Sequence, residues 1–221
     1  MAGLWHYVRR APSKLRKMYF AERVERLHIG SGDVRLQGWV NVDNKRMRGV
    51  DRVVDVTYGL PFRDVQFIFA EHFIEHLDYR DALALLRECR RVLRDDGVLR
   101  LSTPNLDWVW ASHYRRVLRP DEELAGCFAL NRAFRGWGHQ FLYNFGTLRA
   151  TLLDAGFAEV VRVEYGASTH DELRNLEAHE QSADYDGLSH ILIVEASGRG
   201  GHVPDALETL RAEFLRDIDV R

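Results

Sequence analysis

Several features that would point to a particular protein class are scarce or absent in this sequence. Only two of its 221 residues are cysteines, Cys89 and Cys127, too few for a disulfide framework and without the spacing of metal ligands. No apolar run approaches the ~18 residues of a membrane-spanning helix, and the first residues lack the apolar centre of a secretory signal. We therefore expect a location in the reducing cytoplasm.

Charge of one sign is not in excess either. The net charge is −2, so the chain as a whole has no electrostatic attraction to nucleic acid, and we expect no nucleic-acid partner. Residues 4–26 differ, because they mix aromatic with basic side chains. The simplest interpretation is a basic helix lying across the core. The alternative is a peripheral contact with an anionic membrane surface.

What is present is typical of an ordinary globular domain. Apolar residues make up 46% of the chain and charged residues 29%, which allows one sizeable core. Short apolar segments alternate with segments of helical periodicity, and this alternation predicts a parallel sheet covered by helices. We expect a basic N-terminal segment at 1–26, one α/β domain at 27–198, and a linker with a terminal helix at 199–221.

The stretch around which the other motifs are arranged is LHIGSG, at residues 27–32. It indicates a buried strand that ends in a tight turn, because glycine permits the turn and leaves room for a ligand beside the backbone. Asp43 ends the next strand-like segment. In nucleotide-binding α/β folds, ligands lie beyond the carboxyl ends of parallel strands, and an acid at this place binds ribose hydroxyls.

The remaining elements follow from periodicity and turn residues. Residues 106–146 are expected to be irregular and to cover the ligand site, since they are rich in Trp, Phe, His and Gly. Residues 166–187 are expected to form a polar loop with a short helix around 173–179. Further strands are predicted at 52–56, 65–70, 98–102, 160–164 and 189–196, and helices at 81–93, 147–155 and 206–218.

Two sets of sequence motifs carry a resemblance to known proteins. The first set is LHIGSG, NVD, DVTYGLPF, FAEHFIEHL, LRECRRVLRDDGVLRLSTPN and LLDAGF, and the second is PNLDW, WGHQFLYN, ELRNLEAH and ILIVEAS. Over residues 27–197 the chain resembles a class I S-adenosylmethionine (SAM) dependent methyltransferase, and more narrowly a family of methyltransferases associated with polysaccharide biosynthesis. The resemblance implies a Rossmann-like α/β fold, with a mostly parallel seven-stranded sheet and helices on both faces. It also implies SAM as cofactor and methyl transfer to an oxygen of a saccharide or glycolipid precursor.

The resemblance also assigns cofactor contacts. Gly30 and Gly32, with Ser31 between them, match the turn beneath the methionine and ribose parts of SAM. Asp43 matches the acid that takes both ribose hydroxyls.

Two further pairs complete the implied cofactor site. Asp55, with the backbone of Val56, matches the position that reads the adenine amino edge. Glu71 and His72 match positions that line the pocket near the methionyl end and the sulfonium.

The sequence departs from the usual pattern at two places. Only six residues separate Gly32 from Trp39, too few for a crossover helix, so we expect a compact turn there. Gln66 stands where many relatives carry an acid.

His139 and Asp107 are the candidate catalytic residues. A SAM-dependent enzyme must orient its acceptor, exclude water and dispose of a proton. His139 lies in a Gly-Trp-Gly-His segment, and its imidazole titrates near neutral pH. The alternatives are a backbone hydrogen bond for His139 and a helix-capping role for Asp107.

The tract from His72 to His76 also allows a metal interpretation. His72, Glu75 and His76 have the spacing i, i+3, i+4, which places them on one helical face, and His139 could add a ligand. We expect no metal, because such residues also tie a helix start to neighbouring loops.

Two other functions stay open. One is a catalytically silent SAM-binding partner protein, because no residue is an unmistakable catalyst and the terminal helix could serve homo-oligomerisation. The other is a metal-dependent RNA methyltransferase. A nicotinamide-dependent oxidoreductase is disfavoured because Arg35 replaces the third glycine of its motif and Asp43 follows too soon.

Overall fold

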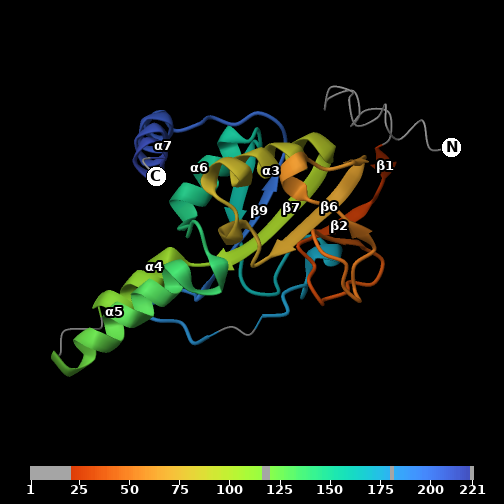
Figure 1. Ribbon diagram of the computed structural model, residues 1–221. Coiled ribbons are helices and arrows are strands. Elements are labelled where there is room, and N and C mark those ends of the chain that lie inside the picture. The colour runs from red at the N-terminus through yellow and green to blue at the C-terminus, as the bar shows by residue number, and fades with distance from the viewer. Residues whose placement is uncertain (1–20, 116–119, 180–181, 220–221) are drawn as a thin grey trace.

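The computed structural model describes residues 21–115, 120–179 and 182–219 (Figure 1). The helix expected within residues 1–26 lies outside the described residues, apart from the last few positions. No helix in the described part of the chain is long and apolar enough to cross a membrane.

The centre of the fold is a sheet of seven strands in the order β4-β3-β2-β6-β7-β9-β8. All strands run parallel except β9, which is antiparallel to both of its neighbours. This is the predicted fold class, a Rossmann-like class I methyltransferase sheet. The strand order reverses between β2 and β6, which is where doubly wound sheets bind ligands. The strands are β2 (Arg26–Ile29), β3 (Val40–Asp43), β4 (Arg52–Val53), β6 (Val65–Glu71), β7 (Leu93–Pro104), β8 (Glu159–Arg162) and β9 (Ile191–Ser197). A separate parallel pair joins β1 (Glu22–Arg23) to β5 (Phe62–Arg63).

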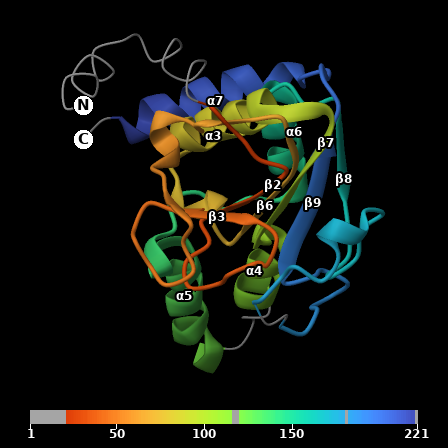
Figure 2. The same ribbon diagram turned by 90° about the vertical axis from the view of Figure 1, so that its right-hand side faces the viewer.

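One face of the sheet is covered by helices α3 (Tyr79–Val92) and α6 (Phe145–Asp154), which carry the apolar core (Figures 1 and 2). The Asp78 carboxylate caps α3 by accepting a hydrogen bond from the Asp81 amide at 2.9 Å, as expected of an aspartate at a helix start. Both helices lie within a few residues of their predicted bounds.

The terminal helix α7 (Asp205–Ile218) lies across α3 and α6 (Figure 2). Phe214 packs against the rings of Tyr79 and Phe141, and Arg211 pairs with Asp154 at 2.6 Å. The terminal helix thus packs on its own domain.

In the described part of the chain, the opposite face of the sheet is covered by loops and a 3-10 turn, and not by the helices that the sequence predicted on both faces. A small apolar cluster of Trp39, Phe67, Phe69, Val98 and Leu173 fills this side. The short helix predicted around residues 173–179 is wrong, because only the 3-10 turn Asp171–Leu173 forms there. The segment is held by buried charges instead of helical packing.

Arg100 is the centre of those charges. Its side chain on β7 is fully buried, and it donates to Glu177 at 2.7 Å and to Glu195 at 2.6 Å. It also donates to the Ala167 carbonyl at 2.7 Å. One cation thus joins strands β7 and β9 to two points of the loop that covers this face, Ala167 and Glu177.

A compact turn replaces the first crossover helix, as the short spacing predicts. Asn41 holds it: its Oδ1 accepts from the Leu36 amide, and its Nδ2 donates to the Leu36 and Trp39 carbonyls, all within 3.1 Å. The His28 ring also bonds Asn41 Oδ1, at 3.0 Å. A single buried amide therefore shapes the segment that follows the glycine turn.

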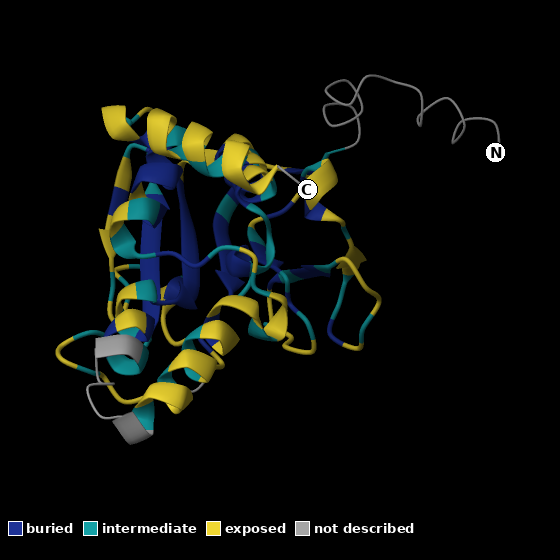
Figure 3. Cartoon of the chain, turned by 60° about the vertical axis from the view of Figure 1, so that its left-hand side comes forward, coloured by how far each residue is buried: buried dark blue, intermediate teal, exposed yellow. Residues whose placement is uncertain are grey.

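The described residues of the 106–146 segment are mostly helical, so the prediction that this segment is irregular is wrong. They form α4 (Leu106–Trp110), a π-helical stretch (Ala111–Arg115), α5 (Pro120–Arg135) and the 3-10 turn η4 (Gly136–Gly138). Helix α5 extends away from the sheet, with much of its surface exposed (Figure 3). A proline at the first helical position with acids behind it is the start signal that the sequence did offer.

We predict that Arg100→Met lowers the free energy of unfolding by about 3–5 kcal/mol, because it leaves two buried carboxylates without their cation. Urea unfolding measures the change. Arg174→Met is the matched control, since Arg174 is exposed and pairs with an exposed Asp171, and it should cost under about 1 kcal/mol. Equal losses in the two variants would contradict the role assigned to Arg100.

His28 makes stability depend on pH. Burial lowers the pKa of His28 below its ordinary 6.5, so the unfolded chain binds this proton first as the pH falls. Its contribution to stability is complete above pH 6.5 and is lost as the pH falls below that value. We expect His28→Gln to flatten the fall of unfolding free energy between pH 6.5 and 5. An unchanged slope in pH-dependent urea unfolding would refute this.

Candidate active site

The glycine turn lies at the carboxyl edge of the sheet, where β2 ends. Gly30 and Gly32 both adopt positive φ, +67° and +52°, which side-chain-bearing residues rarely do. At Gly30 a Cβ atom would overlap the Phe73 ring, whereas at Gly32 it would meet open space. Position 30 therefore requires glycine, both because its φ is positive and because the Phe73 ring leaves no room for a Cβ atom. Ser31 between them is buried.

Asp43 lies beside this turn, as predicted. Its Oδ2 accepts a hydrogen bond from the Gly32 amide at 3.1 Å, and its Oδ1 accepts from the Lys45 amide at 3.0 Å. Each carboxylate oxygen has a second lone pair, so the half-buried group keeps capacity for two hydroxyl donors. The arrangement fits an acid that binds a ribose beside a glycine turn.

Asp55 and Val56 follow β4 at the same edge. The Asp55 carboxylate accepts from the amide and hydroxyl of Thr57, at 3.0 and 2.6 Å, and so caps the 3-10 turn Val56–Tyr58. Its side chain is exposed, and Val56 is buried. In the structure the Asp55 carboxylate therefore serves as the cap of this turn.

Glu71, at the end of β6, anchors the covering loop. Its carboxylate accepts from the amides of Ala178 and His179, at 3.0 to 3.1 Å, and lies 3.3 Å from the His179 ring. The sequence assigned this residue to the methionyl end of the cofactor. In the structure its oxygens serve the loop that closes the site.

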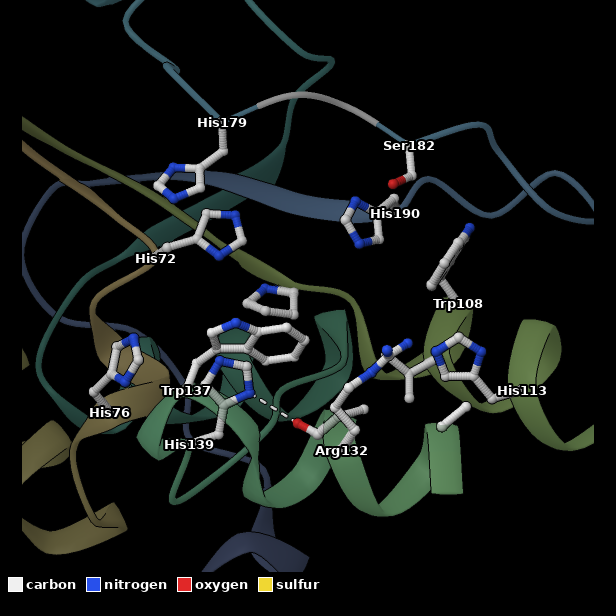
Figure 4. Close-up of a pocket in the computed structure, with 14 residues that line it drawn as sticks. His72, His76, Trp108, His113, Arg132, Trp137, His139, His179, Ser182 and His190 are labelled. Carbon is white, nitrogen blue, oxygen red and sulfur yellow. Dashed lines mark hydrogen bonds between the residues drawn. The ribbon is translucent and has the colours of Figure 1, made fainter. Parts of the chain in front are cut away.

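A cavity of about 490 Å³ opens next to this edge (Figure 4). It lies where β6 and β7 end, between those strand ends and the helices of residues 106–138. Its wall is rich in imidazole and indole rings. The residues that line it include His72, His76, Trp108, His113, Arg132, Trp137, His139, His179 and His190.

His72 enters the cavity wall from the residue after β6. It adopts a positive φ of +45°, which is unusual for a side-chain-bearing residue and typical of functional sites. Its Nδ1 lies 3.1 Å from Glu75 Oε1, and its ring stacks on His179 with centroids 4.3 Å apart. The structure thus brings together two histidines that lie far apart in the sequence.

His139 also lines the cavity, as predicted for a catalytic residue. Its Nδ1 lies 2.8 Å from the Ala133 carbonyl. Because a carbonyl only accepts, Nδ1 carries the proton, and Nε2 is the basic nitrogen. The backbone hydrogen bond that the sequence left as the alternative is therefore present as well, and it orients the ring.

Asp107 is not brought to the cavity. It lies exposed in the first turn of α4, and its amide donates to the side chain of Asn105 at 3.1 Å. The cap of this helix is thus Asn105, two residues earlier. The second catalytic candidate belongs to the helix start rather than to the cavity.

The sequence did not single out His113 or His190, and it assigned His179 to a solvated loop. All three line the cavity. Burial lowers the pKa of His113 and His190, so both rings are neutral at neutral pH. His190 was missed because β9 is antiparallel, which places the residue before that strand at the edge where parallel strands end.

Comparison with known proteins agrees with the chemistry of this edge. Residues 27–101 match the family model of a methyltransferase domain. The match runs from β2 into β7 and includes the glycine turn, Asp43 and Glu71. It supports a methyltransferase that uses SAM, and it leaves the acceptor open. No curated protein matches the chain.

Several solved structures are similar. The YcgJ protein from Bacillus subtilis shares 17% identity over 89% of this chain and 100% of its own, with a TM-score of 0.46. DhpI in complex with SAH shares 14% sequence identity, with 91% of this chain and 90% of DhpI covered and a TM-score of 0.48. The CMeT domain of the citrinin polyketide synthase shares 16% sequence identity, with 89% of this chain and 50% of that chain covered and a TM-score of 0.45. The present chain thus spans about half the length of some neighbours.

We predict that Gly30→Ala is more damaging than Gly32→Ala. Both carry the cost of a positive φ, about 1–2 kcal/mol, but only the first also overlaps the Phe73 ring, which adds about 1–3 kcal/mol. Urea unfolding of the two variants compares them directly. An equal loss of stability would show that the Phe73 contact does not constrain Gly30.

Proposed function

We propose that this protein transfers the methyl group of SAM to an oxygen of a saccharide or glycolipid precursor. The observation that carries the proposal is the Asp43 carboxylate bound to the Gly32 amide, at the switch point of a sheet ordered β4-β3-β2-β6-β7-β9-β8. The methyltransferase-domain match over residues 27–101 supports the reaction. The acceptor class rests on the sequence resemblance and on the chemistry of the cavity.

The main task of the protein in this reaction is to orient the acceptor relative to the methyl group of SAM. The acceptor oxygen attacks the methyl carbon, the S–CH₃ bond breaks, and its electron pair neutralises the sulfonium. The acceptor's proton must leave. Holding the two reactants in line supplies on the order of 7–11 kcal/mol, and the cavity at the ends of β6 and β7 is the place where we expect the acceptor to be held.

His139 is the side chain that we assign to proton removal. Its Nδ1 proton is held by the Ala133 carbonyl at 2.8 Å, which leaves Nε2 as the atom that can accept a proton. The ring belongs to the cavity wall. A positioned imidazole of this kind contributes typically about 10²–10⁴-fold to rate.

The cavity wall suits a sugar-like acceptor. Trp137 is 71% exposed and lines the cavity, so its indole face is available to stack on the C–H face of a pyranose. The neighbouring histidines and Arg132 offer hydrogen-bonding groups to hydroxyls. An apolar acceptor would leave these polar groups unpaired.

We expect Asp43→Ala to weaken SAM binding about 10- to 100-fold, because two charge-assisted hydrogen bonds to ribose hydroxyls are lost at about 1.5–3 kcal/mol in total. Calorimetric titration of the full chain with SAM measures it. Asp33→Ala is the matched control, since Asp33 is an exposed acid in the same turn and should leave the affinity unchanged.

Transfer of labelled methyl from SAM into glycan and lipid fractions of a cell extract then tests the acceptor. Label in one of these fractions, absent with Asp43→Ala, supports the proposal. Tight SAM binding with no transfer to any fraction would instead favour the silent SAM-binding protein. Label found only in protein or RNA would overturn the acceptor class.

A further inference from the structure

Three side chains converge at one end of the cavity: His76 and His139 line it, and Glu75 is buried beside them. Glu75, His76 and His139 each offer a ligand atom, and these atoms all lie within 4.8 Å of one another. The first two belong to the 3-10 turn η2 (Ile74–His76), and His139 follows η4. His76 and His139 lie at the same end of the cavity (Figure 4), with ring centroids 5.2 Å apart.

Glu75 carries a negative charge that its surroundings do not balance. Its side chain is fully buried. Its Oε2 accepts from the Thr103 hydroxyl at 3.0 Å, and its only ion-pair partner among the described residues is His72. No arginine or lysine of the described chain pairs with it. Because a buried carboxylate is costly without a countercharge, this position favours a bound cation.

His139 is oriented as metal-bound histidines are. Such a ring donates its second N–H to a carbonyl or carboxylate, which fixes the tautomer and aims the other nitrogen at the ion. The hydrogen bond from Nδ1 to the Ala133 carbonyl does this. Trp137, two residues earlier, holds a positive φ of +56°, a strained conformation of the kind found at functional sites.

The two segments that carry the cluster are joined before any ligand arrives. The Gln140 amide donates to the Glu75 carbonyl at 2.7 Å, and the Gln140 side chain donates to the His76 carbonyl, also at 2.7 Å. The geometry of the three side chains is therefore set by the fold rather than by a mobile loop.

We propose that Glu75, His76 and His139 bind a divalent transition-metal ion, such as Zn²⁺ or Co²⁺. Two imidazoles with one carboxylate favour such ions over Mg²⁺ or Ca²⁺, which prefer oxygen ligands. Three protein ligands leave coordination positions open, and the cavity lies in front of them. From the sequence we expect no metal; the convergence of His139 on Glu75 and His76 in the structure changes that assignment.

In the context of the proposed function, on which this step rests, the ion binds the acceptor hydroxyl. A metal-bound hydroxyl loses its proton more readily, and the proton passes to water in the cavity. Because both roles need the same Nε2, His139 is a ligand while the ion is bound, and the base role proposed above applies to the ion-free protein. The metal thus specifies an acceptor that presents an oxygen donor to the cavity.

The test is titration of the metal-free, untagged full chain with CoCl₂. Cys127, which is exposed, is replaced by serine so that it does not bind the ion. We expect saturable visible absorption at one Co²⁺ per chain, displaced by ZnCl₂. His76→Gln and His139→Gln should each weaken Co²⁺ binding at least 10-fold. His113→Gln, at the opposite end of the cavity (Figure 4), should change it less than 2-fold.

Glu75→Gln separates a ligand from a merely structural residue. It should weaken Co²⁺ binding and, in the metal-free protein, raise the thermal midpoint, because it removes an unbalanced buried charge. Absence of saturable Co²⁺ binding, or an equal effect of His113→Gln and His139→Gln, would overturn the metal site. Calorimetric titration with SAM is run in parallel. If the protein binds SAM but not Co²⁺, the metal site alone is rejected. If it binds Co²⁺ but not SAM, the proposed function is rejected.

Discussion

The buried guanidinium of Arg100 is the interaction on which the architecture of the site depends. It lies on the sheet face that has no helical cover, between Glu177 and Glu195. Through it the loop of residues 164–190 is fastened to the sheet, and Glu71 completes the attachment at the loop's far side. On this face ion pairs hold the covering segment to the sheet, whereas on the opposite face apolar packing holds the helices. His179, two residues after Glu177, lines the cavity, so this charge pairing supports part of the cavity wall.

The two halves of the candidate site depend on different parts of the chain. The cofactor side uses short-range geometry, since the glycine turn and Asp43 are neighbours in adjacent parallel strands. The acceptor side is assembled from segments far apart in the sequence, with His72, His139 and His190 meeting in one cavity. This division explains why the reaction class is better supported than the acceptor. The contacts proposed for the nucleotide are local, whereas those proposed for the acceptor depend on tertiary packing.

Sequence patterns predicted the sheet and its covering helices well. Continuous apolar runs such as 65–70 are typical of strands buried on both faces, and the helical stripes of α3 and α6 have one apolar side. The predictions failed where packing overrides periodicity. Residues 173–179 were expected to be helical, yet Arg100 binds the Glu177 carboxylate and Glu71 binds the Ala178 amide, and the segment forms turns and loop. Residues 106–146 were expected to be irregular, although α5 carries a clear start signal at Pro120.

The sequence by itself determined the fold class, the glycine turn and the carboxylate beside it, because strand periodicity and a conformational need for glycine are local properties. It also singled out His139 and the His72–His76 tract. Only the tertiary structure decided that Glu75, His76 and His139 meet, that Asp107 lies outside the cavity, and that His190 faces into it. These outcomes depend on the direction of β9 and on the path of the chain between residues 106 and 141, which no short-range pattern encodes.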